Sequence, residues 1–401
     1  MLIVHKYGGT SVGSLERIEN VATRVAKAKA EGNDLVVVVS AMSGETNKLI
    51  GFAEHFSENP SKREMDMLLS SGERVTAALL AIALQEKGYD AVAMSGRQAG
   101  IKTDSSHTYA RIATIDPTPM KKELDAGKIV VVAGFQGISE DGSVTTLGRG
   151  GSDLSAVAIA GALGADACEI YSDVDGIYTT DPRIEPKAKK MDFISYDEML
   201  ELASLGAKVL QNRSVELAKK LKVKIVAKSS FSDAEGTVIG EESEEMEAVL
   251  VSGIALDRNQ ARVSIREVSD RPGVAAEIFT ALAEEQINVD MIIQNASTDG
   301  TTNLGFTVPQ NEVNRAKSVI EAFDHDIGDM DFDDSVCKVS VVGVGMKSHS
   351  GVAATAFSAL AKENINIEMI STSEIKVSMI IAEKYAELAV RTLHAVYELD
   401  A

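Results

Sequence analysis

A short apolar strand, a loop with glycine and hydroxyl side chains, and a helical pattern follow one another three times in the first part of the chain. The strands are the apolar runs Leu2–Lys6, Leu35–Val39 and Ile129–Ala133. Apolar runs of this length, alternating with helices, are typical of a mostly parallel sheet covered by helices. The pattern therefore predicts an α/β fold over residues 1–230. In such sheets ligands bind at the carboxyl ends of the strands, where these loops lie.

The loop Thr145–Asp153, TTLGRGGSD, carries the most chemistry. Its glycines let a ligand approach the backbone, and Arg149 can hold a carboxylate or phosphate through two parallel hydrogen bonds. Ser152 and Asp153 stand where an alanine-rich helix begins, so we expect one of them to be its N-cap. The free N–H groups of that helix would then face the loop. The loop predicts an anion site; a glycine-rich turn capping an ordinary helix is the alternative.

Two further segments are candidate phosphate or nucleotide contacts. Lys6 ends the first strand and stands one residue before GGTS, which favours a phosphate contact over a solvated strand end. The turn at residues 172–183 follows the strand Ala167–Tyr171 and offers Tyr178 for stacking and Arg183 for a phosphate. Glu73 enters an apolar helix expected over residues 61–88, as a helix-dipole partner or a ligand contact. For the turn at residues 172–183 the alternative is an ordinary turn rich in Asp and Gly, which needs no function.

Composition excludes several classes of protein. The net charge of −20 over 401 residues, without a basic stripe, argues against a nucleic-acid binder. The sequence contains no run of about 18 apolar residues that would predict a membrane span. Its first residues lack the layout of a signal peptide. Cys168 and Cys337 form no disulfide framework, and the six histidines show no metal-ligand spacing. We expect a cytoplasmic protein.

The first domain is expected to end in a polar, acidic segment. Tyr196–Leu221 is mostly helical in pattern, and Lys224–Ala227 is predicted to be the last strand of the domain. The segment SFSDAEGTVIGEESEEM follows at residues 230–246 and is expected to be the boundary. We place the domains at residues 1–245, 246–332 and 333–401.

The second part of the chain is an internal repeat. A shift of 78 residues aligns nine identities, which begin with Gly273 on Gly351 and end with Met291 on Met369. Each copy has the order strand, helix, strand, strand, helix, as in ferredoxin-like modules. The segment between the first helix and the second strand is polar within an apolar frame, which suits a small ligand. We expect the amides of Gln294 and Asn366 to be buried there and to need partners.

Together these features resemble the aspartate kinases of the amino-acid kinase family. The motifs that carry the resemblance over nearly the whole chain are KYGGTSV (6–12), VVSAMSGETN (38–47), SGE (71–73), TTLGRGGSD (145–153), YSDVDGIYTTDPR (171–183), GAKVL (206–210) and two tandem ACT repeats. The resemblance implies an amino-acid kinase fold followed by two ferredoxin-like βαββαβ ACT modules. It also implies transfer of the ATP γ-phosphoryl group to the side-chain carboxylate of aspartate, the first step of lysine, threonine and methionine biosynthesis. Inhibition by lysine, threonine or both would act at ACT interfaces.

The resemblance also implies residue roles. The implied catalytic residues are Lys6, Asp153 and Arg149. The implied ATP-binding residues are Lys6, Tyr7, Gly8, Gly9, Ser40, Ser172, Asp173, Tyr178, Thr179, Thr180, Asp181, Pro182, Arg183 and Lys208. The implied substrate-binding residues are Thr46, Glu73, Arg149, Gly150, Gly151 and Ser152. The implied effector-binding residues are Asp270, Gly273, Val274, Ala275, Asn288, Val289, Asp290, Gln294, Val352, Ala353, Asn366, Ile367, Ser373 and Glu374.

These roles fit the chemistry of phosphoryl transfer, which is mostly positioning and charge neutralisation. Lys6 would hold the transferring phosphate and Asp153 would orient Lys6. Arg149 would bind the α-carboxylate of aspartate and Glu73 its α-ammonium group. The substrate carboxylate is itself the nucleophile, so no strong general base is needed. Mg²⁺ would be carried by ATP phosphates and water, with no metal ligand from protein side chains.

Two stretches of the sequence depart from the family pattern, and two other functions are alternatives. Gln211 and Asn212 stand where many members have His-Pro, and Ser350 where a proline is common. The alternatives are a kinase of the same fold for another small acid and a catalytically silent sensor of amino acids and nucleotide. KYGGTSV and the ACT pair speak against the first; the presence of Lys6, Arg149 and Asp153 speaks against the second. ACT modules usually pair across subunits, so a homo-oligomer is expected.

Overall fold

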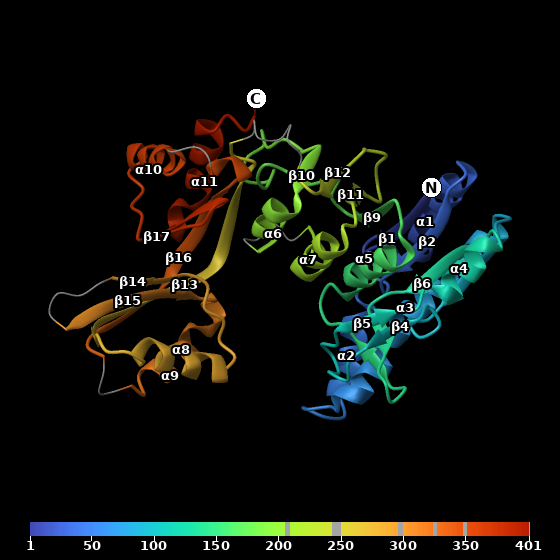
Figure 1. Ribbon diagram of the computed structural model, residues 1–401, viewed down its shortest axis with the longest axis horizontal. Helices are drawn as coiled ribbons and strands as arrows, with labels where there is room; N and C mark the ends of the chain where they lie inside the picture. Colours follow the sequence, from blue (N-terminus) through green and yellow to red (C-terminus); the bar gives the residue numbers. More distant parts are fainter. Residues whose placement is uncertain (205–208, 243–249, 296–299, 324–326, 348–350, 401) are drawn as a thin grey trace. The chain divides into compact units, whose positions relative to one another are not determined.

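The computed structural model describes residues 1–204, 209–242, 250–295, 300–323, 327–347 and 351–400. The chain forms two compact units (Figure 1). Unit 1 consists of Met1–Ile177, Lys190–Ala203 and Lys208–Ser243. Unit 2 consists of Tyr178–Lys189, Ser204–Ala207 and Glu244–Ala401.

Unit 1 alternates strands and helices along most of its length. Its elements are β1 (Leu2–Tyr7), α1 (Leu15–Ala30), β2 (Asp34–Val39), α2 (Glu45–Glu54), α3 (Lys62–Glu86), β3 (Ala91–Met94), β4 (Ile101–Thr103), β5 (Ile112–Ile115), α4 (Thr118–Asp125), β6 (Ile129–Ala133), β7 (Gln136–Ile138), β8 (Val144–Thr146), α5 (Gly151–Leu163), β9 (Ala167–Ser172), β10 (Phe193–Ser195), α6 (Tyr196–Ser204), α7 (Asn212–Leu221), β11 (Ile225–Ser229) and β12 (Thr237–Gly240).

An eight-stranded sheet forms the centre of unit 1. Its strand order is β10-β12-β11-β9-β1-β2-β6-β3, and every neighbouring pair is parallel except β11 and β12. The valine-rich strands β2 and β6 are buried along nearly their whole length, as expected for central strands covered on both faces. The predicted α/β class is confirmed.

Helices α1 and α3 share a core with the central strands. Val21 and Val25 of α1 and Leu80 and Leu84 of α3 pack in one cluster with side chains of β1, β2 and β6. By length and composition alone α3 could cross a membrane. Its place in this core accounts for its apolar composition.

Two predictions for unit 1 are wrong in detail. The N-cap of α5 is Gly150, in the left-handed conformation with φ 70°, so Ser152 and Asp153 lie within the first helical turn. A left-handed turn favours glycine, which displaces the expected polar cap. Lys224–Ala227 is not the last strand either, because β12 follows it inside the expected boundary segment and pairs with both β11 and β10.

A second, four-stranded sheet in unit 1 was not predicted. It has the order β5-β4-β7-β8, and its strands are three or four residues long. Strands this short show no measurable period in the sequence. The sheet matters for function because β8 leads directly into the glycine loop at residues 147–150.

Unit 2 contains the two repeat copies. Its elements are β13 (Gly253–Ser269), α8 (Val274–Glu284), β14 (Ile292–Gln294), β15 (Thr301–Val308), η2 (Gln310–Glu312), α9 (Val313–Ile320), β16 (Met330–Val342), η3 (Val344–Lys347), α10 (Val352–Lys362), β17 (Met369–Thr372), β18 (Lys376–Ala382), η4 (Glu383–Tyr385) and α11 (Ala386–Val396). The repeat order of strand, helix, strand, strand and helix is confirmed in both copies.

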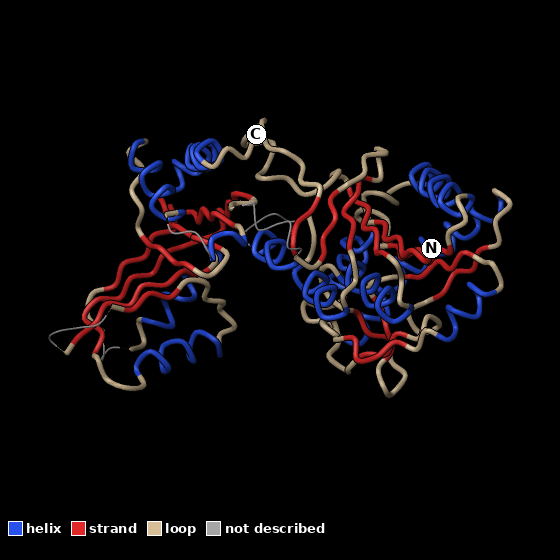
Figure 2. Tube along the Cα trace, turned by 45° about the horizontal axis from the view of Figure 1, so that its top comes forward, coloured by secondary structure: helices blue, strands red, loops and turns tan. Residues whose placement is uncertain are grey.

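The two copies share one six-stranded sheet, β14-β15-β13-β16-β18-β17. Helices α8 and α9 pack on one part of the sheet and α10 and α11 on the other, each pair with its own core (Figure 2). The long strands β13 and β16 run through both parts, and Ile254, near the start of β13, belongs to the core of α10 and α11.

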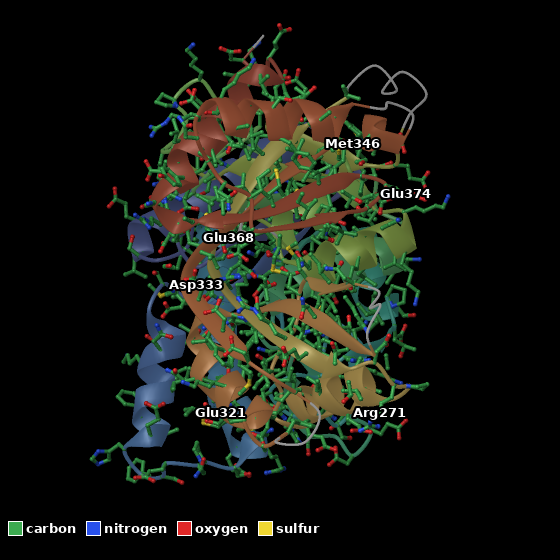
Figure 3. The ribbon with its side chains drawn as sticks, turned by 90° about the vertical axis from the view of Figure 1, so that its left-hand side faces the viewer. Arg271, Glu321, Asp333, Met346, Glu368 and Glu374 are labelled. Atoms are coloured by element: carbon green, nitrogen blue, oxygen red, sulfur yellow. The ribbon has the colours of Figure 1, made fainter. Side chains whose placement is uncertain are left out.

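Between the two parts of this sheet lies a cluster of charged side chains. Arg262 of β13 contacts Asp331 at 2.8 Å and Glu368 at 3.1 Å, and Asp333 lies 3.8 Å from the same guanidinium. Figure 3 labels Asp333 and Glu368 in this region. The register of β13 against β16 shifts immediately before Arg262.

Candidate active site

The carboxyl ends of the central strands meet at one edge of the large sheet. The Gly8 N–H donates to the Tyr171 carbonyl at 3.2 Å, which joins the ends of β1 and β9. The Ser40 N–H donates to the Tyr7 carbonyl at 3.1 Å, which joins β2 to β1. Three of the predicted loops therefore start side by side, as parallel topology requires.

Lys6 and Asp153 form the charged centre of this edge. The Lys6 Nζ lies 2.5 Å from the Asp153 Oδ1, and the two residues are 8% and 7% exposed. Lys6 comes from β1 and Asp153 from the first turn of α5, so two elements far apart in sequence supply the pair. An isolated charge at this depth would be costly, and each group offsets the burial of the other.

Close packing brings α5 against the ends of β2 and β6. A Cβ added to Gly134, just after β6, would lie 2.9 Å from the Val38 side chain and 3.1 Å from the Ser152 Oγ. The Phe135 N–H donates to the Ser155 Oγ at 3.0 Å. The first turn of α5 is thus fixed against the sheet, with its positive end at the loop Gly148–Gly150.

Glu73 is a buried carboxylate with one oxygen unused. It is 4% exposed, and its Oε1 accepts the Ala41 N–H at 3.2 Å. Within the part of the chain that the structure describes, its Oε2 has no hydrogen-bond partner. Burial raises the pKa of Glu73 to about 7, against its hydrogen bonds. Such an oxygen suits a cationic ligand group, which would restore the charged form.

The remaining predicted substrate residues border the same loops. Arg149 is exposed and Thr46 lies half-buried in the first turn of α2. A Cβ at Gly150 would overlap the Gln211 side chain, so Gln211 packs against this loop. Gly151 is packed against Phe135.

Ser172 is tied to the first glycine loop through a residue that sequence reasoning missed. The Ser230 N–H and Oγ both donate to the Ser172 carbonyl, at 2.9 and 3.0 Å. The Ser230 Oγ also lies 2.8 Å from the Ser11 Oγ. Asp173 follows at the exposed end of the strand. No sequence motif marks Ser230, which directly follows β11. Its contact with Ser172 could be predicted only from the strand order, in which β11 lies next to β9.

The other predicted nucleotide residues belong to unit 2 or fall outside the described residues. Tyr178–Arg183 cluster with unit 2, where the Thr179 Oγ1 lies 2.9 Å from the His394 Nε2 and Arg183 pairs with Asp181 at 2.7 Å. Pro182 and Thr180 belong to the same segment. Lys208 falls outside the described residues.

Asp66 of α3 is a second residue that sequence reasoning missed. It is fully buried and contacts His107, Thr108 and Thr146. A lone aspartate early in an amphipathic helix gives no sequence signal. Across the described ranges, no cluster of three or more His, Cys, Asp or Glu side chains is arranged to hold a metal ion.

In unit 2 the predicted effector residues of the first copy fall into two groups. Asp270, Gly273, Val274, Ala275 and Gln294 line a cavity of about 340 Å³ at the start of α8, together with Ser269, Arg271 and Thr302. Asn288, Val289 and Asp290 do not line it. Val289 packs against the core, and Asp290 pairs with the buried Lys338.

The expectation of buried amides is wrong. Gln294 and Asn366 are both exposed. Gln294 ends the edge strand β14, and Asn366 precedes the edge strand β17, so only one side of each position is covered. In the second copy, Val352 is buried, Ala353 and Ile367 pack against its core, and Ser373 and Glu374 form the turn before β18.

Comparison with known families matches both units. The model described as the amino acid kinase family matches residues 1–228. The model described as the ACT domain matches residues 263–322 and 339–397. The first match covers more than half of the chain.

Curated relatives and solved structures resemble the chain over nearly its full length. An aspartokinase from Helicobacter pylori is 61% identical over 404 residues, with 100% of both chains covered. An aspartokinase from Geobacillus stearothermophilus is 50% identical, covering 99% of this chain and 97% of its own. The structure of Escherichia coli aspartokinase III with aspartate and ADP has a TM-score of 0.81 and 26% identity, with 99% of both chains covered. The same enzyme with lysine and aspartate has a TM-score of 0.80, covering 98% of this chain and 99% of its own.

The raised pKa of Glu73 predicts a pH-dependent effect of Glu73→Gln on stability. The folded state holds its proton up to about pH 7 and the unfolded state releases it near 4.5, so the wild type loses stability as pH rises between these values. Glutamine does not titrate. The free energy of unfolding of the variant, relative to that of the wild type, should therefore rise by up to about 3 kcal/mol from pH 5 to pH 8. Urea unfolding of the ligand-free protein at both pH values measures this; an equal difference at both would contradict the burial of a titrating carboxyl.

Proposed function

The chain belongs to the amino acid kinase family and is an aspartate kinase; from this premise we propose how its residues perform the reaction. The first unit transfers the γ-phosphoryl group of ATP to the side-chain carboxylate of L-aspartate, giving 4-phospho-L-aspartate. The observation that carries this proposal is the buried contact of Lys6 with Asp153 at the loop edge of the sheet.

In this proposal Lys6 neutralises charge on the transferring phosphoryl group. Its ammonium group stands beside Gly8, where an added Cβ would lie 3.5 Å from the Lys6 Nζ. Glycine keeps that approach open to a phosphate oxygen. Asp153 holds the ammonium group in place before ATP arrives, so no reorganisation is needed at the moment of transfer.

The proposed aspartate site lies between Glu73 and the Arg149 loop. The unused Oε2 of Glu73 receives the α-ammonium group, and the guanidinium of Arg149 receives the α-carboxylate. Binding the ammonium group would lower the pKa of Glu73 and keep it ionised. The substrate side chain, ionised at neutral pH, attacks the phosphorus directly, so this site needs no strong general base.

ATP is proposed to lie along Tyr7, Gly8, Gly9, Ser40, Ser172 and Asp173 of unit 1. The family resemblance also implies nucleotide contacts from Tyr178–Arg183 and Lys208, and these stay predictions. Because the described residues include no carboxylate cage, we propose that Mg²⁺ is held by the phosphates of ATP and by water, where it would neutralise phosphate charge.

Regulation is proposed to act through the ACT modules. The cavity beside α8 has the size and the polar lining, including Asp270 and Gln294, for a free amino acid such as lysine or threonine. An effector inhibits only by binding the inactive arrangement more tightly than the active one. We further propose that the protein is a homo-oligomer through these modules.

An ATP-dependent hydroxamate assay over aspartate, glutamate and N-acetylglutamate tests the substrate. Hydroxamate is expected with aspartate alone. Product with another acid in preference would overturn the substrate assignment, and no product with any acid would favour a silent sensor.

Lys6→Ala should lower kcat by about 10²–10³-fold, because it removes charge neutralisation made in the transition state. Circular dichroism should show an unchanged fold, and the exposed Lys62→Ala serves as the matched control. A near-normal kcat in Lys6→Ala would remove the phosphate role from this residue.

Arg149→Lys should raise the KM for aspartate about tenfold or more, because lysine keeps the charge but loses the planar fork. The KM for ATP should stay within about twofold. Arg63→Lys, at an exposed position of α3, is the control. If the KM for aspartate does not change, the α-carboxylate binds elsewhere.

Gln294→Ala should desensitise the enzyme to its amino-acid inhibitor while kcat without inhibitor stays within a few-fold. A coupling of about 1–3 kcal/mol is usual for such effects. The exposed Asn314→Ala of α9, outside the cavity lining, is the control. Calorimetric titration of lysine and threonine separates loss of binding from loss of coupling; unchanged binding and inhibition would refute the cavity as the sensor.

A further inference from the structure

One face of helix α3 anchors three separate segments that border the proposed aspartate site. Asp66, Ser70 and Glu73 are spaced four and three residues apart, so they lie on the same face of the helix, and all three are buried. Glu73 receives the Ala41 N–H, as described above. The Ser70 carbonyl accepts the Gln136 Nε2 at 2.8 Å, at the start of β7.

Asp66 makes the most contacts of the three. Its Oδ1 accepts the hydroxyl of Thr146 at 2.5 Å, and its Oδ2 lies 2.6 Å from the His107 Nδ1. Both oxygens lie within 3.1 Å of the Thr108 N–H. A fully buried carboxylate with this many partners is held in one orientation, and it fixes its partners in turn.

These partners belong to the segments that shape the substrate loop. Thr146 is the last residue of β8, three positions before Arg149. Thr108 has a positive φ of 70°, which a threonine adopts only where its surroundings impose it. The next residue, Tyr109, covers the loop: a Cβ added to Gly148 would lie 3.0 Å from its ring.

Arg213 closes the same arrangement from α7. It donates to the Leu147 carbonyl at 2.6 Å and to the Ala110 carbonyl at 3.2 Å. Arg213 therefore joins the residue after Thr146 to the segment that contains Thr108. Arg149 itself is exposed, so the direction of its side chain depends on how firmly the backbone before it is held.

We propose that Asp66 is a positioning residue for the phosphoryl acceptor. Through Thr146 and His107 it fixes the backbone that presents Arg149 to the α-carboxylate of aspartate. The proposal rests on the proposed placement of aspartate at Arg149. The aspartate site then requires contacts from one face of α3, one carboxylate touching the substrate and the other holding the loop that touches it.

The decisive variant is Thr146→Val, which keeps the shape of the side chain and removes only its hydroxyl. We expect the KM for aspartate to rise about five- to tenfold, with the KM for ATP within twofold and kcat within threefold. Thr146→Ser restores the hydroxyl and should return the KM for aspartate to within twofold of the wild type. Asp66→Ala and His107→Ala should shift the same constant in the same direction.

The matched control is Thr103→Val, which removes a buried hydroxyl of the same small sheet that pairs with Thr145 at 2.6 Å rather than with α3. It should leave the KM for aspartate within twofold of the wild type. A rise equal to that of Thr146→Val would mean that any loosening of this sheet weakens aspartate binding, and it would overturn the proposal.

A double-mutant cycle tests whether both contacts act through Asp66. The effects of Thr146→Val and His107→Ala on aspartate KM should be less than additive when combined, because they share one carboxylate. Full additivity would contradict a single positioning residue. If Arg149→Lys raises the KM for aspartate and Thr146→Val does not, only this inference fails. If Arg149→Lys has no effect, the proposed placement of aspartate fails first.

Discussion

The contact between Lys6 and Asp153 forms only when β1 of the central sheet and the helix α5 are both in place. Lys6 is carried by a central strand and Asp153 by the first turn of a helix almost 150 residues later. Either charge alone at this depth would lower the stability of the fold. The large sheet, the glycine loops and the packing of α5 together hold the Lys6 ammonium group in one position beside Asp153. An incoming phosphate has only to share it with a carboxylate that is already there.

Two buried carboxylates on α3 show how partners distinguish a structural group from a functional one. Asp66 has its oxygens occupied by Thr146, Thr108 and His107. Glu73, seven residues on, has one oxygen engaged and the other without a hydrogen-bond partner among the described residues. The same helix face thus carries one carboxylate whose oxygens both have hydrogen-bond partners and one with an unpaired oxygen among the described residues. The unpaired oxygen lies where a positively charged ligand group is expected.

Sequence periodicity predicted the large sheet and its helices well, because apolar runs such as Ile129–Ala133 and the helix Leu15–Ala30 are long enough to show their pattern. The glycine loops were recognised because clustered glycine and hydroxyl residues directly follow those apolar runs. The small sheet was missed, since three-residue strands have no period. Asp66 and Ser230 were missed because their partners lie far away in sequence, 80 residues in the case of Asp66 and Thr146. Exposure at Gln294 depended on its strand being at an edge, which composition does not reveal.

The long strands of unit 2 have a consequence for how the regulatory half can be divided. Gly253–Asp257 pairs with Lys338–Val342, so the start of β13 completes the sheet on which α10 and α11 pack. A fragment beginning after β13 would leave the backbone groups of β16 open along one side, and unpaired sheet edges recruit other chains. The residues of the second copy alone therefore do not form a complete sheet. The second copy depends on the start of β13, a strand whose later part belongs to the first copy, so a gene fusion or deletion that separates the two copies would yield a protein prone to aggregate.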